Sequence, residues 1–105
     1  MKADPTDLLA KTVEPLLEQQ ADFMQGHNIQ ADAGWRAGVL SLTLPPKREA
    51  AVRSVLSYEV DSDGSVVKRT RLRGGPESTR QLAANDIEPG TVTRTIAAFV
   101  RTAGW

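Results

Sequence analysis

The strongest constraint on the fold is a four-residue turn sequence between two stretches of alternating residues. Asp61-Ser62-Asp63-Gly64 separates residues 55–60 from residues 66–72. Two strand-like stretches joined by so short a polar, glycine-containing segment are typical of a β-hairpin. The chain is therefore predicted to contain an antiparallel sheet.

Alternation along this hairpin divides its side chains into two faces. If Val60 lies opposite Val66, the two-residue period fixes the other cross-strand pairs. These pairs are Tyr58 with Lys68, Leu56 with Thr70, and Ser54 with Leu72. The apolar face is predicted to be buried and comprises Val52, Leu56, Tyr58, Val60, Val66 and Leu72.

The opposite face of the hairpin is basic. Its arginines, which we take as candidate binding residues, are Arg53, Arg69, Arg71 and Arg73. Alternate residues of a strand point the same way, and guanidinium groups suit phosphates and carboxylates equally. The face is therefore a candidate surface for nucleic acid or for an acidic protein. The alternative is a solvated sheet face whose charges discourage aggregation.

A helix is predicted before the sheet. Asp4-Pro5 is a favourable helix start, and Gly26 is a plausible stop. An apolar stripe lies between them: Leu9, Val13, Leu16, Leu17, Phe23 and Met24. Pro15 cannot donate to the carbonyl of Lys11, so the sequence predicts one kinked helix or two abutting helices.

The remaining elements follow from similar patterns. Residues 26–34 are predicted to be a loop, residues 35–44 a strand, and residues 49–56 a helical turn or the start of a strand. The sequence does not decide how residues 76–90 fold; a short helix over residues 76–84 is one candidate, and Glu88-Pro89-Gly90 favours a turn. Thr91 is then the expected cap of a final amphipathic helix, with the stripe Val92, Ile96, Phe99, Val100 and Ala103.

These elements predict a single α+β domain over residues 1–105. Its core is a small three-stranded antiparallel sheet, with a fourth strand as an alternative. A kinked N-terminal helix and a C-terminal helix are expected to pack on one face of this sheet, in the order helix, strand, strand, strand, helix.

Charge and composition narrow the functional classes. The 105 residues carry 13 basic and 13 acidic side chains and no cysteine. Residues 1–35 hold two bases and six acids, so the positive charge is concentrated in the rest of the chain. No apolar run resembles a signal peptide or a membrane span. A cytoplasmic protein without disulfides is expected.

Few residues are suited to catalysis or metal binding. His27 is the only histidine and Tyr58 the only tyrosine. The string Glu59–Gly64 resembles the opening of a calcium loop, but a glutamate stands at its first position and Thr70 at its twelfth. The sequence therefore indicates neither a cofactor nor a metal site. A small hydrolase or isomerase that uses His27 with a nearby carboxylate is the enzymatic alternative.

The order helix, three strands, helix resembles double-stranded-RNA-binding domains, and also the dimeric chaperones of secretion systems. The first resemblance implies recognition of duplex shape by basic groups. Those domains carry a lysine cluster at the start of their last helix, where this chain has Arg94 alone. The second resemblance implies a homodimeric adaptor.

The sequence favours a non-enzymatic binding or adaptor protein. It is expected to form a homodimer or to bind a protein partner through a sheet face or a helix groove, because two amphipathic helices exceed what three strands can cover. The alternatives are nucleic-acid binding through the four arginines and catalysis at His27.

Overall fold

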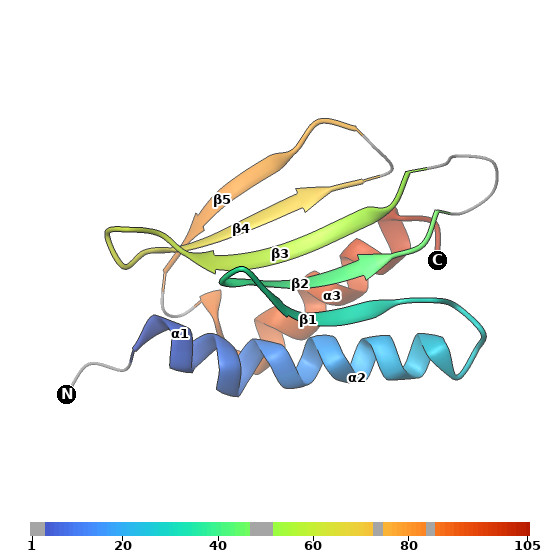
Figure 1. The fold of residues 1–105 in the computed structure, drawn as a ribbon, viewed down its shortest axis with the longest axis horizontal. Coiled ribbons are helices and arrows are strands. Elements are labelled where there is room, and N and C mark those ends of the chain that lie inside the picture. The colour runs from blue at the N-terminus through green and yellow to red at the C-terminus, as the bar shows by residue number, and fades with distance from the viewer. Residues whose placement is uncertain (1–3, 47–51, 73–74, 84–85) are drawn as a thin grey trace.

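The sheet has five strands in an antiparallel meander. The computed structural model describes residues 4–46, 52–72, 75–83 and 86–105. The strands are β1 (Asp32–Arg36), β2 (Val39–Leu44), β3 (Ser54–Val60), β4 (Val66–Arg71) and β5 (Ser78–Leu82). They lie in the order β1-β2-β3-β4-β5, so each strand pairs with its neighbour in the sequence (Figure 1).

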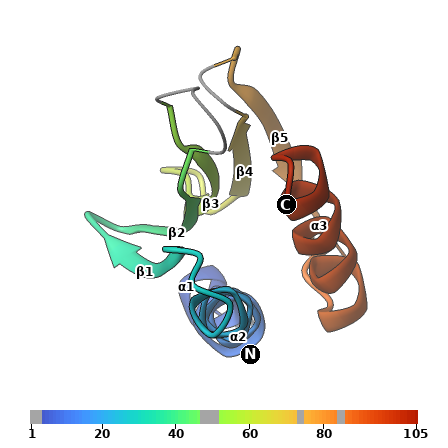
Figure 2. The ribbon, with the colours of Figure 1, turned by 90° about the vertical axis from the view of Figure 1, so that its right-hand side faces the viewer.

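The helices cover one face of this sheet. The N-terminal helical run comprises α1 (Pro5–Leu8), a π-helical turn (Leu9–Val13) and α2 (Glu14–Gln25), and the C-terminal helix is α3 (Pro89–Thr102). Figure 2 shows α2 below the β1–β2 end of the sheet and α3 beside the β4–β5 end. The predicted α+β class and the two flanking helices are confirmed, whereas the sheet is larger than the predicted three or four strands.

The core lies between the sheet and the helices. Its fully buried large side chains are Leu9, Val13, Leu17, Met24, Leu40, Leu42, Leu44, Leu56, Tyr58 and Val92. Leucines at every second residue of β2 point at the helices, as the period of a strand requires. Val52, which the sequence places on the buried face, is instead 46% exposed because it precedes β3 and lies beyond the helices.

Pro15 neither breaks the first helix nor separates two helices. α1, the π-helical turn and α2 follow one another without a gap, and Pro15 lies at the first turn of α2. The backbone N–H of Glu14 donates to the carbonyl of Leu9, five residues back. Because of this wider turn, Pro15 lies in the first turn of α2. A residue there needs no backbone N–H for the hydrogen bonds of the α-helix.

β1 is a strand that the sequence did not indicate. It lies within the predicted 26–34 loop and the start of the predicted 35–44 strand, and it pairs with β2 through a turn at Ala37-Gly38. Both turn residues have positive φ, 52° and 79°. The turn was missed because an alanine stands where asparagine, aspartate or glycine usually signals such a geometry.

The β3–β4 hairpin forms as predicted. Val60 pairs with Val66, and the same register places Tyr58 opposite Lys68 and Leu56 opposite Thr70. Its loop is closed by hydrogen bonds from the N–H of Asp61 to the carbonyl of Ser65 (2.7 Å) and from the N–H of Gly64 to the carbonyl of Asp61 (2.9 Å). The Asp63 carboxylate accepts from the N–H of Ser65, which lowers the pKa of that carboxyl.

Replacing Gly64 with alanine is expected to lower the free energy of unfolding by about 1 to 2 kcal/mol. Gly64 has a φ of 87°, a conformation that costs a residue with a Cβ about that much. Gly90→Ala is the matched control, because Gly90 lies in the first turn of α3 with no atom within 4 Å of an added Cβ. Urea unfolding should show Gly64→Ala destabilised and Gly90→Ala unchanged or slightly more stable. Equal effects would contradict a requirement for positive φ at Gly64.

The stretch whose fold the sequence left undecided contains a strand, and the candidate short helix over residues 76–84 does not form. Residues 78–82 form β5, which pairs antiparallel with β4 from Thr70–Ser78 to Val66–Leu82. The open edge of β4 presents unpaired backbone N–H and C=O groups, and pairing with them outweighs a weak local helical preference.

The start of the last helix also differs from the prediction. α3 begins at Pro89, and Glu88 is its N-cap residue without a side-chain capping bond. The predicted turn and the predicted cap at Thr91 are therefore wrong, because proline suits the first helical position. The predicted apolar stripe is confirmed, with Val92, Ile96, Phe99 and Ala103 buried.

Candidate functional site

A groove runs between α2 and α3 on the side away from the sheet. It has a volume of about 350 Å³ and is lined mainly by Leu16, Gln20 and Phe23 of α2 and by Thr93, Ile96 and Ala97 of α3. The Phe23 side chain is 63% exposed, the largest exposure among the large apolar residues that the structure describes. The groove is therefore an apolar surface in contact with solvent.

Phe23 is exposed because the buried stripe of the first helix does not include it. The buried positions continue from Val13 through Leu17 and Ala21 to Met24, in steps of four, four and three residues. Phe23 directly precedes Met24 and is therefore turned about 100° away from the stripe. Phe23 is part of the apolar stripe noted in the sequence but not of its buried part, and this angular offset was the signal that could have identified it.

Acidic side chains line the opposite edge of α2. Glu14, Glu18 and Asp22 follow one another at intervals of four residues, so they lie on one side of the helix. The Glu14 carboxylate accepts a 2.7 Å hydrogen bond from the Trp35 indole and thereby ties α2 to β1. A hydrogen bond with Glu14 and the repulsion of Glu14 and Asp22 raise the pKa of Glu18. This edge therefore carries unbalanced negative charge.

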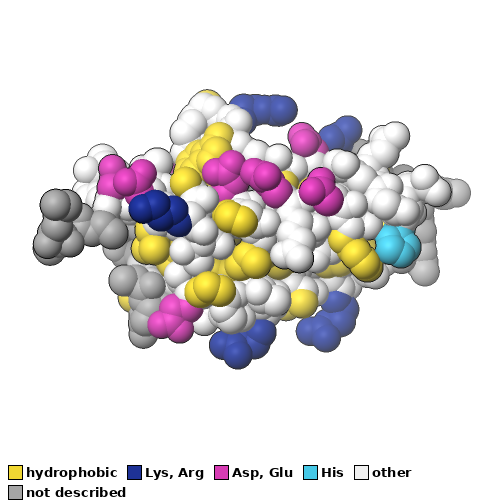
Figure 3. Space-filling view, turned by 90° about the horizontal axis from the view of Figure 1, so that it is seen from below, with side chains coloured by type: hydrophobic (Ala, Val, Ile, Leu, Met, Phe, Trp, Pro, Cys, Tyr) yellow, Lys and Arg dark blue, Asp and Glu magenta, His cyan; other side chains and the backbone are white. Residues whose placement is uncertain are grey.

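Basic side chains stand on α3. Arg94 and Arg101 are both exposed and lie seven residues apart, two turns along one side of the helix. Figure 3 shows the helical face with hydrophobic side chains along its middle and most of its acidic side chains in a row on one side of them. Lys/Arg side chains lie at both edges of the view, and the lower edge also carries an acidic side chain. The face thus has an apolar centre between an edge rich in acidic side chains and the side of α3 that carries Arg94 and Arg101.

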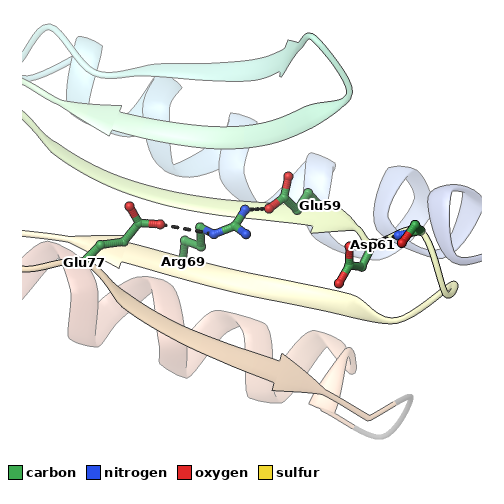
Figure 4. A network of polar contacts seen from close by, with 5 residues as sticks. Glu59, Asp61, Arg69 and Glu77 are labelled. Atoms are coloured by element: carbon green, nitrogen blue, oxygen red, sulfur yellow. Dashed lines mark hydrogen bonds and ion pairs between the residues drawn. The ribbon is translucent and has the colours of Figure 1, made fainter.

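The four predicted arginines are only partly brought together. Arg69 forms ion pairs with Glu59 of β3 and, at 3.1 Å from its Nε to a carboxylate oxygen, with Glu77 just before β5 (Figure 4). Two carboxylates therefore offset the one guanidinium, an arrangement that the sequence analysis missed. Glu59 is the diagonal neighbour of Arg69 on the same face of the sheet. This contact could be predicted from the strand pairing once the register is known.

The other three arginines lie apart from this network. Arg71 is exposed at the end of β4, on the face away from the helices. Arg53 lines a polar hollow of about 370 Å³ on the same face, beside Asp32, Arg36 and Thr43. Arg73 falls outside the described residues.

His27 lies just beyond the end of α2 and is exposed. Its Nδ1 is 2.9 Å from the carbonyl oxygen of Phe23, and its ring lies 4.6 Å from the Phe23 ring, centroid to centroid. These contacts place it at the end of the α2–α3 groove. They bring it neither a serine nor a carboxylate.

The described residues contain no group of three or more histidine, cysteine, aspartate or glutamate side chains placed to hold a metal ion. Among the same residues, no helix has the length and apolar character needed to cross a membrane.

Three comparisons with known proteins give the same result. No protein-family model matches this sequence, and neither the curated proteins nor the solved structures contain a significant match to it.

Proposed function

We propose that this chain is a non-enzymatic binding protein that acts as a homodimer, joined through the face formed by α2 and α3. The observation that carries the proposal is the apolar α2–α3 groove with Phe23 exposed beside it. A second copy of the chain is the occupant, because one edge of this face is rich in acidic side chains and the other is the side of α3 that carries Arg94 and Arg101.

The apolar centre supports an interface. Protein interfaces combine a desolvated apolar or aromatic centre with a polar rim, and aromatic anchors supply much of the binding energy. Phe23 and Leu16 provide such a centre, with Ala97 on the facing helix. Water leaves these side chains when a second apolar surface covers them, which favours association.

The charges make this face complementary to itself. A two-fold axis parallel to the groove places α2 of one copy over α3 of the other. The acidic edge of each α2 then faces the arginines of the partner's α3. Rotation about this axis does not shift a residue along the direction of the helices. Phe23 and Ala97 line the same groove and therefore lie at a similar level along it. Asp22, next to Phe23, then comes near Arg101 of the partner, one turn beyond Ala97. The same contact would reduce the repulsion among the acidic side chains of α2, which adds to the Glu14 hydrogen bond and desolvation in raising the pKa of Glu18.

The two alternatives have less support. Nucleic-acid binding through the arginines is weakened by the pairing of Arg69 with Glu59 and Glu77. Catalysis at His27 needs a partner for proton transfer, and the contacts of His27 are with Phe23. Both stay predictions.

The dimer is tested by sedimentation velocity at several protein concentrations. We expect the wild-type chain to dimerise and Phe23→Glu to weaken the dimer at least tenfold, because the variant places a carboxylate in the apolar centre. Phe23 is exposed, so the variant should fold like the wild type. A wild-type chain that stays monomeric at high concentration would overturn the proposal.

Charge exchange tests the geometry of the dimer. Asp22→Lys and Arg101→Glu should each weaken the dimer, and the double variant should recover most of the loss, since it restores opposite charges across the interface. Arg71→Glu, on the other face of the sheet, is the control and should have no effect. A dimer that survives Phe23→Glu would place the contact elsewhere.

Absorbance spectra of the same samples at low and high salt would show any bound nucleic acid, and a salt-labile complex would favour the arginine alternative.

A further inference from the structure

A second hollow lies on the other side of α3, between that helix and the sheet. This trough has a volume of about 400 Å³, within the range of small-molecule sites. Thr91, Thr95 and Thr102 line it from α3, and Lys68, Thr70 and Leu72 line it from β4 and the residue after β4. Lys68 and Leu72 are four residues apart, which makes the trough about 13 Å long on the strand side. The dimer groove is lined by other residues of α3, although Arg94, which lines the trough, also stands on the basic edge of the proposed dimer face.

Cationic side chains gather at one end of the trough. Lys68 is directly opposite Arg80 in the β4–β5 register, so the two side chains share the face of the sheet that points to α3. Arg94 lines the trough from the helix. In the described part of the chain, the ion pairs involve Arg69, and none reaches Lys68, Arg80 or Arg94. Three positive charges are therefore left without a paired acid.

The Lys68 ammonium is partly withdrawn from water. Desolvation and the nearby charge of Arg80 lower the pKa of Lys68, and Asp86 offsets only part of this effect. The N-terminus of α3 lies at the same end of the trough, because Thr91 is in its first turn. The helix dipole adds positive potential there. An anion placed between these groups would relieve the repulsion.

The rest of the trough is mostly apolar, and the hydroxyls of Thr95 and Thr102 that line it donate to carbonyls of α3 itself. Leu56 and Phe99 are buried and form its floor, and Leu72 and Ala98 contribute further apolar surface. β4 and α3 run in the same direction (Figure 1), so Lys68 lies near the start of the helix and Leu72 near its end. The trough thus changes from cationic to apolar along its length. Neither an inorganic anion nor a hydrocarbon alone matches both ends.

We infer that the trough between α3 and β4 binds a small amphiphilic anion, a carboxylate or phosphate attached to an unbranched alkyl chain. The anionic group binds to Lys68, Arg80 and Arg94, and the chain lies over Leu56 and Phe99 towards Leu72. Arg94 is the residue that this site shares with the basic edge of the proposed dimer face, whereas Lys68, Leu56 and Phe99 do not line the dimer groove.

Isothermal titration calorimetry with decanoate, decyl phosphate, decanol and inorganic phosphate tests the site. We expect one decanoate or decyl phosphate per chain, and binding at least tenfold weaker for decanol and for inorganic phosphate. A free carboxylate and a lipid-like phosphate are distinguished by which of the two anions binds more tightly. Decanol binding as tightly as decanoate would remove the role of the cations. Inorganic phosphate binding as tightly as decyl phosphate would remove the role of the apolar floor. Either result, or binding of neither decanoate nor decyl phosphate, would overturn the inference.

Variants locate the ligand. Lys68→Met keeps the apolar stem of the lysine and removes its charge, so it should weaken decanoate binding about tenfold or more. Arg71→Gln, on the same strand but on the opposite face, is the matched control and should bind like the wild type. Phe23→Ser alters the other groove and should also bind normally. If Phe23→Ser weakens binding as much as Lys68→Met does, the ligand lies between α2 and α3 and the inference is wrong.

Discussion

Replacing Leu42 with alanine is expected to lower the free energy of unfolding by about 2 to 5 kcal/mol. Leu42 is fully buried, lies in the middle of β2, and pairs with Ala33 of β1 and Leu56 of β3. The substitution removes apolar contacts and leaves a cavity between the sheet and the helices, since β2 is held on both sides and cannot collapse into it. A domain of this size has a total stability of about 5 to 15 kcal/mol, so the loss is a large share of it.

The measurement is urea unfolding at one fixed protein concentration, followed by tryptophan fluorescence. Ser41→Ala is the matched control, because Ser41 neighbours Leu42 on β2 and points to the opposite face of the sheet. It should change the stability by no more than about 0.5 kcal/mol. A Leu42→Ala variant as stable as Ser41→Ala would contradict the position of the core beneath β2.

Raising the pH from 10 to 12 is expected to cost about 2 kcal/mol of stability through Tyr58 alone. Burial raises the pKa of Tyr58 from its ordinary value of 10.0 to about 12, and each pKa unit corresponds to about 1.4 kcal/mol. The folded pKa lies above the unfolded one. The stabilisation is therefore complete below pH 10 and is lost as the pH rises through 12. The residue is 1% exposed, so water does not screen the buried phenolate.

Tyr58 is the only tyrosine, so the ultraviolet absorbance of tyrosinate reports on it alone. The folded protein should titrate near pH 12 and the urea-unfolded protein near pH 10. Tyr58→Phe is the control for stability, because other groups also titrate at high pH. One of them, Lys68, changes the stability in the opposite direction. Burial lowers the pKa of Lys68, so its deprotonation at high pH removes an unfavourable buried charge and stabilises the folded state. A folded-state midpoint near pH 10 would show that Tyr58 is accessible to water.

The elements that could be predicted are those whose signals are local. The β3–β4 hairpin and its register follow from four turn residues and a two-residue alternation. The first helix and α3 could be predicted because their apolar residues recur with the helical period and therefore share one side of each helix. In each of them, neighbours in the sequence make the contacts that stabilise the element.

The outer strands of the sheet could not be predicted in this way. β1 contains a glycine and few strand-favouring residues, and four of the five residues of β5 are exposed. Their backbone groups form strands because β2 and β4 offer unpaired partners, a reason that exists only after the inner strands have formed.

The candidate sites divide in the same way. The sequence by itself determined the charge asymmetry, the cluster of basic residues on β4, and the absence of cysteine chemistry. Only the tertiary structure decided which of these charges remain free. It placed Glu59 and Glu77 on Arg69, and in the part of the chain that the structure describes it left Lys68 and Arg80 facing α3 without an ion pair. It also brought Phe23 beside Ala97, which lies more than 70 residues away in the chain. The physical reason is that a residue type sets which interactions a side chain can make, whereas packing sets which partners are near enough to make them.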